Sequence, residues 1–246
     1  MKNQHKILII AHRGASNVAP ENTLKAFQKA IELRADYIEF DIHQTKDREL
    51  VIRHDANISK LDGTMSLIRD MTLKELKAID IGQGEKIPTL NELIEISKGN
   101  IGLWVEIKVQ KLGKVLIEIL KNEDLLETSI ISSFIFRELQ ELKKIISGLK
   151  LGLILSEKMT SQRMVIKFCR KAIKNNFLAI HSYWRHINKE IVEFSHSNNL
   201  KVNAWTAIYE SINDSDLKEL VNLGIDGLIH NDIQQARRVI KEIYQT

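Results

Sequence analysis

The chain is poor in cysteine and proline, with one cysteine and two prolines in 246 residues. A single cysteine, Cys169, excludes an internal disulfide framework and is typical of proteins in a reducing compartment. It lies at helical spacing in the segment VIKFCRKAI, which predicts a buried thiol. The chain also has no linker rich in serine or glycine, so we expect a single domain over residues 1–246.

Long hydrophobic runs are missing as well. The N-terminal segment MKNQHKILIIAHRG has only five consecutive apolar residues, which is too few for the core of a signal peptide. No window approaches the roughly 20 apolar residues that a membrane-spanning helix needs. We therefore expect a cytoplasmic protein without stable membrane insertion.

The positive charge is modest and dispersed. The formal net charge is +4 and the pI is near 9.0, and the lysines are spread over most of the expected helices. No alternation of basic and aromatic residues marks a nucleic-acid-binding stripe. We expect a solvated cationic surface that attracts anionic small-molecule substrates over distance. The pattern indicates no particular oligomeric state.

Short aliphatic runs alternate with segments of helical period through most of the chain. Eight such runs are present, at residues 6–10, 36–42, 101–109, 128–134, 150–155, 177–182, 200–207 and 226–231. Because most are apolar on both faces, they predict parallel strands with helices on the outside. A closed α/β barrel of eight strand-helix units, the TIM barrel, typically has about 250 residues and matches this length. A doubly wound open sheet is the alternative, although no glycine-rich dinucleotide fingerprint or Walker-type loop follows a strand.

Residues 55–86 interrupt the repeat. They contain short periodic pieces and the turn signals DGT and GQG, which predict a small insertion after the second strand. Directly before them, residues 50–54 (LVIRH) lie close enough to residues 36–42 to form one bent strand or an extension of that strand. Within the insertion, residues 65–79 are mildly amphipathic.

Polar residues gather where the expected strands end. In a barrel of this kind the carboxyl ends of all strands converge on one face. Those ends carry His12 and Arg13, Glu39 and Asp41, His54 and Asp55, Glu106 and Lys108, Trp205, and His230 and Asn231. We therefore expect these side chains to form one site.

The carboxylates Glu39, Asp41 and Glu106 lie in apolar strands, where an unpaired charge carries a large desolvation cost. Glu39 and Asp41 are two positions apart and so point to the same side of their strand. Three convergent carboxylates predict an oxygen-rich site for Mg²⁺ or Ca²⁺. A purely structural cluster of ion pairs with lysine or arginine is the alternative.

Arg13 and Lys108 add groups that bind anions, and His12 and His54 add groups that transfer protons near neutral pH. A metal ion with basic side chains suits a phosphate ester, whose developing negative charge needs cations around it. Two histidines suit a reaction that needs a base for the nucleophile and an acid for the leaving alcohol. The residues therefore predict cleavage of a phosphodiester.

The motifs AHRGAS, APENTLKAF, ADYIEFDIHQTKDRELVIRHD, IPTLNEL, VEIK, NAWT and GIDGLI occur in this order over nearly the whole chain. In sequence and order they resemble glycerophosphodiester phosphodiesterases. The block from Ala11 to Asp55 is highly specific, whereas HRG alone would not be. The resemblance implies a TIM barrel that hydrolyses glycerophosphodiesters to an alcohol and sn-glycerol 3-phosphate with a divalent cation.

The resemblance also implies roles for individual residues. The two acid/base histidines of the family fall on His12 and His54, and its metal-binding carboxylates fall on Glu39, Asp41 and Glu106. Its phosphate-binding residues fall on Arg13 and Lys108, and Trp205 matches an aromatic residue that lines the substrate pocket. The small insertion of the family corresponds to residues 55–86. The family route runs through a cyclic phosphate, which forms when a hydroxyl of the substrate attacks phosphorus and which water later opens.

Two segments depart from the family pattern. The family usually has Thr-Asp and a following proline after its last strand, where this chain has residues 230–233 (HNDI), and its Leu-Asp-Arg-Thr-Thr is replaced by residues 58–62 (ISKLD). Both changes fall near the expected substrate end, so they leave the head-group preference open. A lysophospholipase D acting on lipid diesters and a binding protein on a decayed barrel are the alternative functions.

Four further polar residues have mainly structural interpretations. We expect His43 to be structural, and we expect His181 to be either a core histidine or a residue that reaches the site. His196 is expected at the end of a helix. Asn22 is expected to cap the first helix, with a possible contact to the site.

Overall fold

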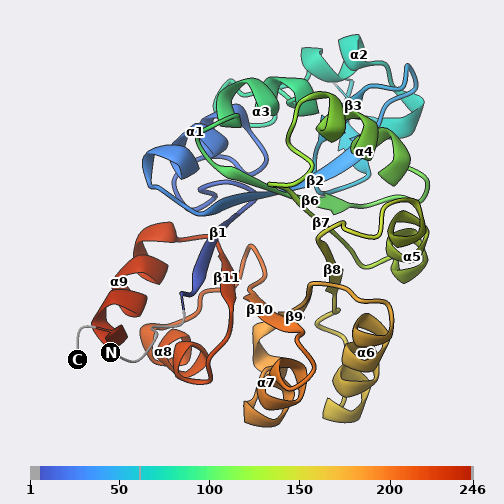
Figure 1. Cartoon of the computed structure of the whole chain (residues 1–246). Coiled ribbons are helices and arrows are strands. Elements are labelled where there is room, and N and C mark those ends of the chain that lie inside the picture. The colour runs from blue at the N-terminus through green and yellow to red at the C-terminus, as the bar shows by residue number, and fades with distance from the viewer. Residues whose placement is uncertain (1–5, 61, 245–246) are drawn as a thin grey trace.

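Eight parallel strands close into a barrel in the computed structural model, which describes residues 6–60 and 62–244 (Figure 1). The strands are β1 (Leu8–His12), β2 (Tyr37–Gln44), β6 (Gly102–Ile107), β7 (Ile130–Ser133), β8 (Leu151–Ile154), β9 (Ala179–Tyr183), β10 (Lys201–Trp205) and β11 (Gly227–His230). β1 pairs with both β2 and β11, so the sheet closes on itself. The predicted TIM barrel is confirmed, and the open doubly wound sheet is excluded.

Helices ring the outside of the barrel (Figure 1). They are α1 (Leu24–Glu32), α3 (Leu90–Ser97), α4 (Gly113–Asn122), α5 (Phe136–Ile145), α6 (Gln162–Lys174), α7 (Lys189–His196), α8 (Asp214–Asn222) and α9 (Ile233–Tyr244). Each buries an apolar stripe against the strands, as Phe27 of α1 and Leu93 of α3 do. Cys169 of α6 is buried in this layer, as predicted.

Thr23, not Asn22, is the N-cap of α1, because the Thr23 side chain accepts a hydrogen bond from the backbone N–H of Ala26. The expectation that Asn22 caps this helix is therefore wrong. Asn22 instead has a left-handed backbone conformation with φ of 56° and is buried. Its side chain points toward the carboxyl end of β2. The expectation for His196 is confirmed, since it ends α7.

The segment between β2 and α3 forms a small appendage (Figure 1). It contains β3 (Leu50–Ile52), the hairpin of β4 (Asn57–Ser59) and β5 (Met65–Leu67), the 3₁₀ turn η1 (Ile68–Asp70) and α2 (Leu73–Ala78). β3 runs antiparallel to β2, with Ile52 opposite Ile42. The expectation of one bent or extended strand is therefore wrong. The chain reverses at residues 45–49, where Arg48 has a φ of 70°.

The amphipathic stretch of residues 65–79 packs its apolar side into the appendage. Its larger apolar side chains belong to a separate small core made by Val51, Ile58, Ile68, Met71, Leu76, Ile79 and Ile87. Met65 is the exposed exception. Leu61, in the segment that departs from the family pattern, lies outside the described residues. Throughout residues 6–60 and 62–244, no helix combines the length and hydrophobicity needed to cross a bilayer.

Apolar side chains fill the barrel interior beneath the pocket. Ile10, Trp104, Ile130 and Ile229 pack together there. The ring of His181 lies against the backbone of Gly152, where an added Cβ would be 1.8 Å from the imidazole Nε2. This filling leaves the carboxyl ends of the strands as the face at which a cavity remains.

The N-terminus of α4 has no cap of its own and depends on a side chain from α5. Its N-cap position is Leu112, which offers no hydrogen-bonding side chain. The buried Glu138 carboxylate instead accepts hydrogen bonds from the backbone N–H groups of Lys111 at 2.8 Å and Gly113 at 3.0 Å. A negative charge at this position also interacts favourably with the helix dipole.

We expect Glu138→Ala to lower the free energy of unfolding by about 2 kcal/mol, because one buried and one part-buried N–H group lose a charged acceptor. Urea denaturation would measure the loss. Glu141→Ala is the matched control: Glu141 lies on the same helix and only pairs with Lys144 at the surface, so its stability should stay near that of the wild type. Equal losses in the two variants would contradict the capping role of Glu138.

Candidate active site

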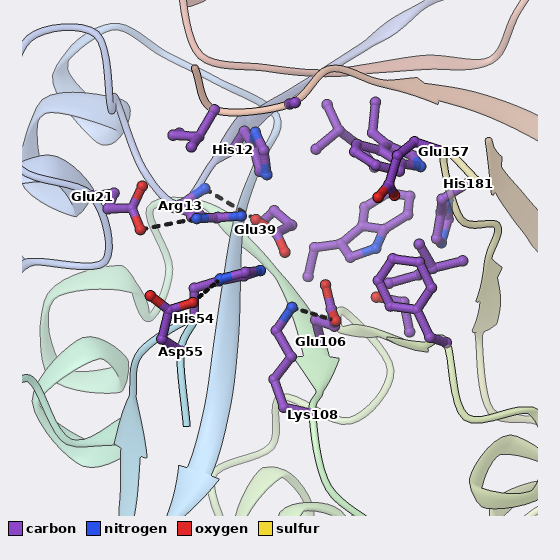
Figure 2. A pocket seen from close by; sticks show the side chains of 18 of the residues that line it. His12, Arg13, Glu21, Glu39, His54, Asp55, Glu106, Lys108, Glu157 and His181 are labelled. Atoms are coloured by element: carbon purple, nitrogen blue, oxygen red, sulfur yellow. Dashed lines mark hydrogen bonds and ion pairs between the residues drawn. The ribbon is translucent and has the colours of Figure 1, made fainter. Parts of the chain in front are cut away.

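A pocket of about 360 Å³ opens at the carboxyl ends of the strands (Figure 2). It is lined by most residues that the sequence placed in the site, namely His12, Arg13, Glu39, His54, Asp55, Glu106, Lys108 and Trp205. Asp41 lies directly beneath them and is buried. The structure thus brings these residues together from five strands or the turns that follow them, whereas the expectation for His230 is wrong: it does not line this pocket, and its Nε2 lies 2.9 Å from the Gln235 side chain.

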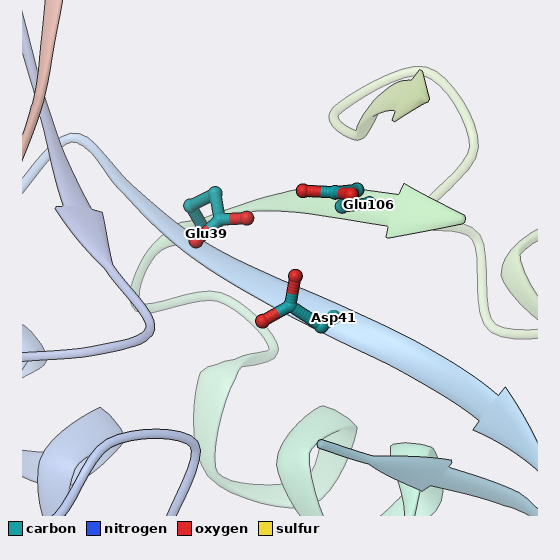
Figure 3. Close-up of side chains that lie close together, drawn as sticks. All are labelled: Glu39, Asp41 and Glu106. Atoms are coloured by element: carbon teal, nitrogen blue, oxygen red, sulfur yellow. The ribbon is translucent and has the colours of Figure 1, made fainter. Parts of the chain in front are cut away.

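Three buried carboxylates form the centre of the site (Figure 3). Glu39 and Asp41 are two positions apart on β2 and lie on the same face of the strand. Asp41 is opposite Glu106 of β6 in the register of the two strands. One oxygen from each carboxylate lies within 4.8 Å of the other two. This spacing and the oxygen-only donor set fit a hard divalent cation.

Two cations contact the carboxylates. The Lys108 ammonium lies 2.9 Å from an oxygen of Asp41 and 2.6 Å from an oxygen of Glu106. The Arg13 guanidinium lies 3.6 Å from Asp41 and forms an ion pair of 2.9 Å with Glu21. Arg13 has a φ of 55°, and this left-handed turn lets its backbone N–H donate to Glu39 at 3.0 Å.

The charges of Arg13 and Lys108 are too few to neutralise the three carboxylates, because Arg13 also forms an ion pair with Glu21. Burial raises the pKa of Glu106 to about 7, and the neighbouring Asp41 adds to the rise. Burial and the charges of Asp41 and Glu106 likewise raise the pKa of Glu39. For Asp41 burial also acts to raise the pKa, but Lys108 and Arg13 outweigh it and hold the value below its usual range. A further cation would therefore stabilise the cluster.

His12 is held in one tautomer by Asn231. The Asn231 amide nitrogen donates to the backbone carbonyls of Ile208 at 3.0 Å and Ala207 at 3.4 Å. The amide oxygen must therefore face His12, where it lies 2.8 Å from Nδ1. Nδ1 consequently carries the proton and Nε2 keeps a lone pair. Burial lowers the pKa of His12 to about 3, so the ring is neutral.

His54 is positioned by two contacts from different directions. Its Nδ1 lies 2.8 Å from the carboxylate of Asp55, and its backbone carbonyl accepts a hydrogen bond of 3.1 Å from Nε2 of His43. His43 is buried, in agreement with the structural role expected for it. Burial lowers the pKa of His54, and the charge of Lys108 acts in the same direction.

His181 is buried and also lines the floor of the pocket, so both of its expected interpretations apply. The amide of Asn22 donates to Asp41 at 2.8 Å, so the contact to the site expected for this residue is confirmed. The structure adds residues that the sequence did not single out. Glu21 reaches Arg13 from the loop before α1. Phe134 and Glu157 line the pocket from the loops after β7 and β8. No local pattern marks these residues, because their importance depends on which loops face the pocket.

Comparisons with known proteins agree on one family. Residues 12–235 match the model of the glycerophosphoryl diester phosphodiesterase family. A glycerophosphodiester phosphodiesterase from Caldanaerobacter subterraneus subsp. tengcongensis is 32% identical over 251 residues, which cover 96% of this chain and 99% of that protein. A human lysophospholipase D is 34% identical, but over only 41% of this chain and 36% of its own length.

Solved structures support the same likeness. A glycerophosphodiester phosphodiesterase from Thermotoga maritima superposes with a TM-score of 0.77 at 28% identity, covering 99% of this chain and 100% of that one. A phosphodiesterase from Oleispira antarctica in complex with the product sn-glycerol-3-phosphate has a TM-score of 0.80 at 27% identity, covering 95% and 96%. Both extend over nearly the whole chain.

We expect Asn231→Leu to release His12 from its single tautomer, because the acceptor for Nδ1–H is lost. The ¹⁵N chemical shifts of the His12 ring would report a mixture of the two neutral forms, and turnover should fall about 10- to 100-fold, as for other supporting residues. Asn231→Asp keeps an acceptor at the same position and should keep the Nδ1–H form. Wild-type ring shifts in Asn231→Leu would contradict the assignment.

Proposed function

The chain belongs to the glycerophosphoryl diester phosphodiesterase family, and from this premise we propose that it hydrolyses glycerophosphodiesters to an alcohol and sn-glycerol 3-phosphate. The observation that carries the proposal is the geometry of the pocket. Two histidines and two cations surround a buried cluster of three carboxylates. Phosphodiester hydrolysis needs both proton transfer and positive charge around phosphorus, and this site offers both.

Arg13 and Lys108 are proposed to bind the phosphate. Each presents hydrogen-bond donors to the pocket, and each is held in place by carboxylates on its other side. The Asp41 and Glu106 charges outweigh the opposing effect of burial and raise the pKa of Lys108, so it stays charged. Trp205 is proposed to line the substrate pocket beside them.

His12 and His54 are proposed as the acid/base pair. The neutral His12 ring, with its lone pair on Nε2, is suited to take the proton of the attacking hydroxyl. Asp55 accepts from the Nδ1 side of His54 and partly offsets the lowering of the His54 pKa by burial and Lys108, and His54 is assigned to protonate the leaving alcohol. In the proposed second step the two roles are reversed: His54 takes a proton from the water that opens the cyclic phosphate, and His12 protonates the hydroxyl that leaves phosphorus.

Glu39, Asp41 and Glu106 are proposed to hold a divalent cation, Mg²⁺ or Ca²⁺. Their donor chemistry and spacing fit such an ion, and the shortage of positive charge in the cluster favours one. When bound, the ion would polarise a phosphoryl oxygen and offset negative charge as it develops. The alternative, a purely structural set of ion pairs, leaves Glu39 with no cationic side chain within ion-pair distance among the described residues.

A lysophospholipase D activity has weaker support. The human lysophospholipase D matches less than half of this chain. The amphipathic stretch of residues 65–79, which could have offered an apolar rim for lipid, buries most of its apolar side chains within the appendage. The binding-protein alternative is disfavoured because all residues of the proposed machinery are present in the pocket or directly beneath it.

The proposed function predicts release of sn-glycerol 3-phosphate from glycerophosphocholine in the presence of Mg²⁺ or Ca²⁺, with loss of turnover when EDTA removes the ion. An enzyme-coupled assay for glycerol 3-phosphate measures the turnover of glycerophosphocholine with the ion and after addition of EDTA. Lysophosphatidylcholine serves as the comparison substrate, and because its cleavage gives lysophosphatidic acid and choline, its turnover is followed by choline release and should be slower. Turnover of the lysolipid alone would favour the lysophospholipase D instead, and turnover unaffected by EDTA would contradict the metal site.

Glu39→Gln should weaken divalent-cation binding at least about tenfold and reduce activity with it, because a buried carboxylate ligand becomes a neutral amide. His54→Ala should abolish most of the activity while its affinity for the ion stays near that of the wild type. Isothermal titration calorimetry with Mg²⁺ and Ca²⁺ separates the two effects. Unchanged affinity in Glu39→Gln would show that the carboxylate cluster is wrongly assigned.

Cation binding should strengthen as the pH rises from about 6 to 8. The pKa of Glu106 is about 7 and that of Glu39 is raised, so both carboxyls hold protons at low pH and must lose them to bind the ion. Each proton released adds up to about tenfold in affinity per pH unit below the pKa. Calorimetry at pH 6, 7 and 8 would test this, and equal affinities would rule out proton competition at these carboxylates.

A further inference from the structure

The charged groups and the aromatic groups of the pocket come from different parts of the barrel. The proposed catalytic and metal-binding residues lie on β1, β2, β3 and β6 or on the turns that follow them, and these strands are neighbours in the sheet. Phe134, Glu157, Trp205 and Tyr209 follow or end β7, β8 and β10. The pocket therefore has one wall built for phosphate and another of different chemistry.

The second wall presents a fixed aromatic surface. The indole of Trp205 donates a hydrogen bond to the backbone carbonyl of Leu155 at 3.2 Å, which sets its orientation. Its ring lies 5.2 Å from that of Tyr183 behind it and meets Phe134 edge-on at 6.5 Å. Phe134 is 43% exposed, so its ring is accessible from the pocket mouth. The Lys108 ammonium already lies 5.8 Å from the centroid of the Phe134 ring, so Trp205 is the ring that offers its π electrons to a further cation, while Phe134 adds apolar contact.

Glu157 adds a negative charge to this wall. Its side chain is exposed at the pocket, and Figure 2 shows it on the opposite side from Glu21 and Asp55. Glu21 and Asp55 are paired with Arg13 and His54. Within residues 6–60 and 62–244 Glu157 forms no ion pair, and its one hydrogen bond is a long contact of 3.4 Å from the Ser156 hydroxyl.

A carboxylate at this position repels the phosphate of a bound substrate and attracts a positively charged group elsewhere in the same substrate. With the phosphate at Arg13 and Lys108, one of its two ester groups faces the remaining wall, and the charge of Glu157 favours the one that carries an ammonium group. An alcohol that carries an ammonium group gains from both Glu157 and the face of Trp205. A neutral polyol such as glycerol or inositol gains from neither.

We propose that Glu157, Trp205 and Phe134 form a subsite for cationic head groups, so that diesters of choline and ethanolamine are preferred to diesters of glycerol and inositol. This inference rests on the proposed function, since it names the substrate class of the same pocket. The expected preference in kcat/KM is about tenfold, as befits a partly exposed cation–π contact with one nearby carboxylate.

The test compares kcat/KM for glycerophosphocholine, glycerophosphoethanolamine, glycerophosphoglycerol and glycerophosphoinositol. The wild type should favour the first two, and Glu157→Gln and Trp205→Leu should each move the choline-to-glycerol ratio toward one. Trp205→Phe keeps an aromatic face and should keep part of the preference. Glu95→Gln makes the same charge change on the exposed side of α3 and should keep the wild-type ratio.

Binding separates this inference from the proposed function. Calorimetry with the His54→Ala protein and Mg²⁺ should show tighter binding of glycerophosphocholine than of glycerophosphoglycerol, and this difference should disappear when Glu157→Gln is added. That result would support the subsite even if the wild type turned over no diester, an outcome that would contradict only the proposed function. Equal binding of the two diesters, or a ratio unchanged by Glu157→Gln, would overturn the subsite.

Discussion

The burial of three carboxylates at one end of the barrel is the constraint on which the site depends. Unpaired charges at this depth are costly, so every contact around Glu39, Asp41 and Glu106 serves to offset them. Lys108 bridges two of the carboxylates, and Arg13 approaches the third through its backbone N–H. These contacts leave net negative charge, and this imbalance is what makes the cluster suited to a divalent cation.

The supporting contacts come from β2 and from loops that follow other strands. Asn231 selects the tautomer of His12, His43 holds the backbone of His54, and Asn22 and Glu21 orient Asp41 and Arg13. A closed parallel barrel makes this possible, because it brings the loops after all eight strands to one face. The same closure brings an aromatic and acidic wall to the pocket that holds Arg13 and Lys108, and the proposed recognition of both ends of a zwitterionic diester depends on it.

Local patterns account for the parts of the fold that were predicted correctly. The eight apolar runs identify the strands because a buried parallel strand is apolar on both faces, and the intervening 3.6-residue period identifies the helices. The antiparallel course of β3 was missed. A run such as LVIRH has the same composition in either direction, and the reversal depends on a turn at residues 45–49 that carries no glycine or proline.

The sequence by itself determined the barrel, the family and the set of charged residues at the strand ends, since periodicity and the order of motifs are local properties of the chain. Only the tertiary structure decided how those residues are paired. The N-cap of α1 is Thr23 and not Asn22, the tautomer of His12 is set by a residue 219 positions away, and Glu157 lines the same pocket as the aromatic wall. The last two depend on the distance between loops that are remote in sequence, and side-chain spacing along a chain carries no information about that distance. The cap of α1 differs because Asn22 adopts a left-handed conformation and donates its side chain to Asp41.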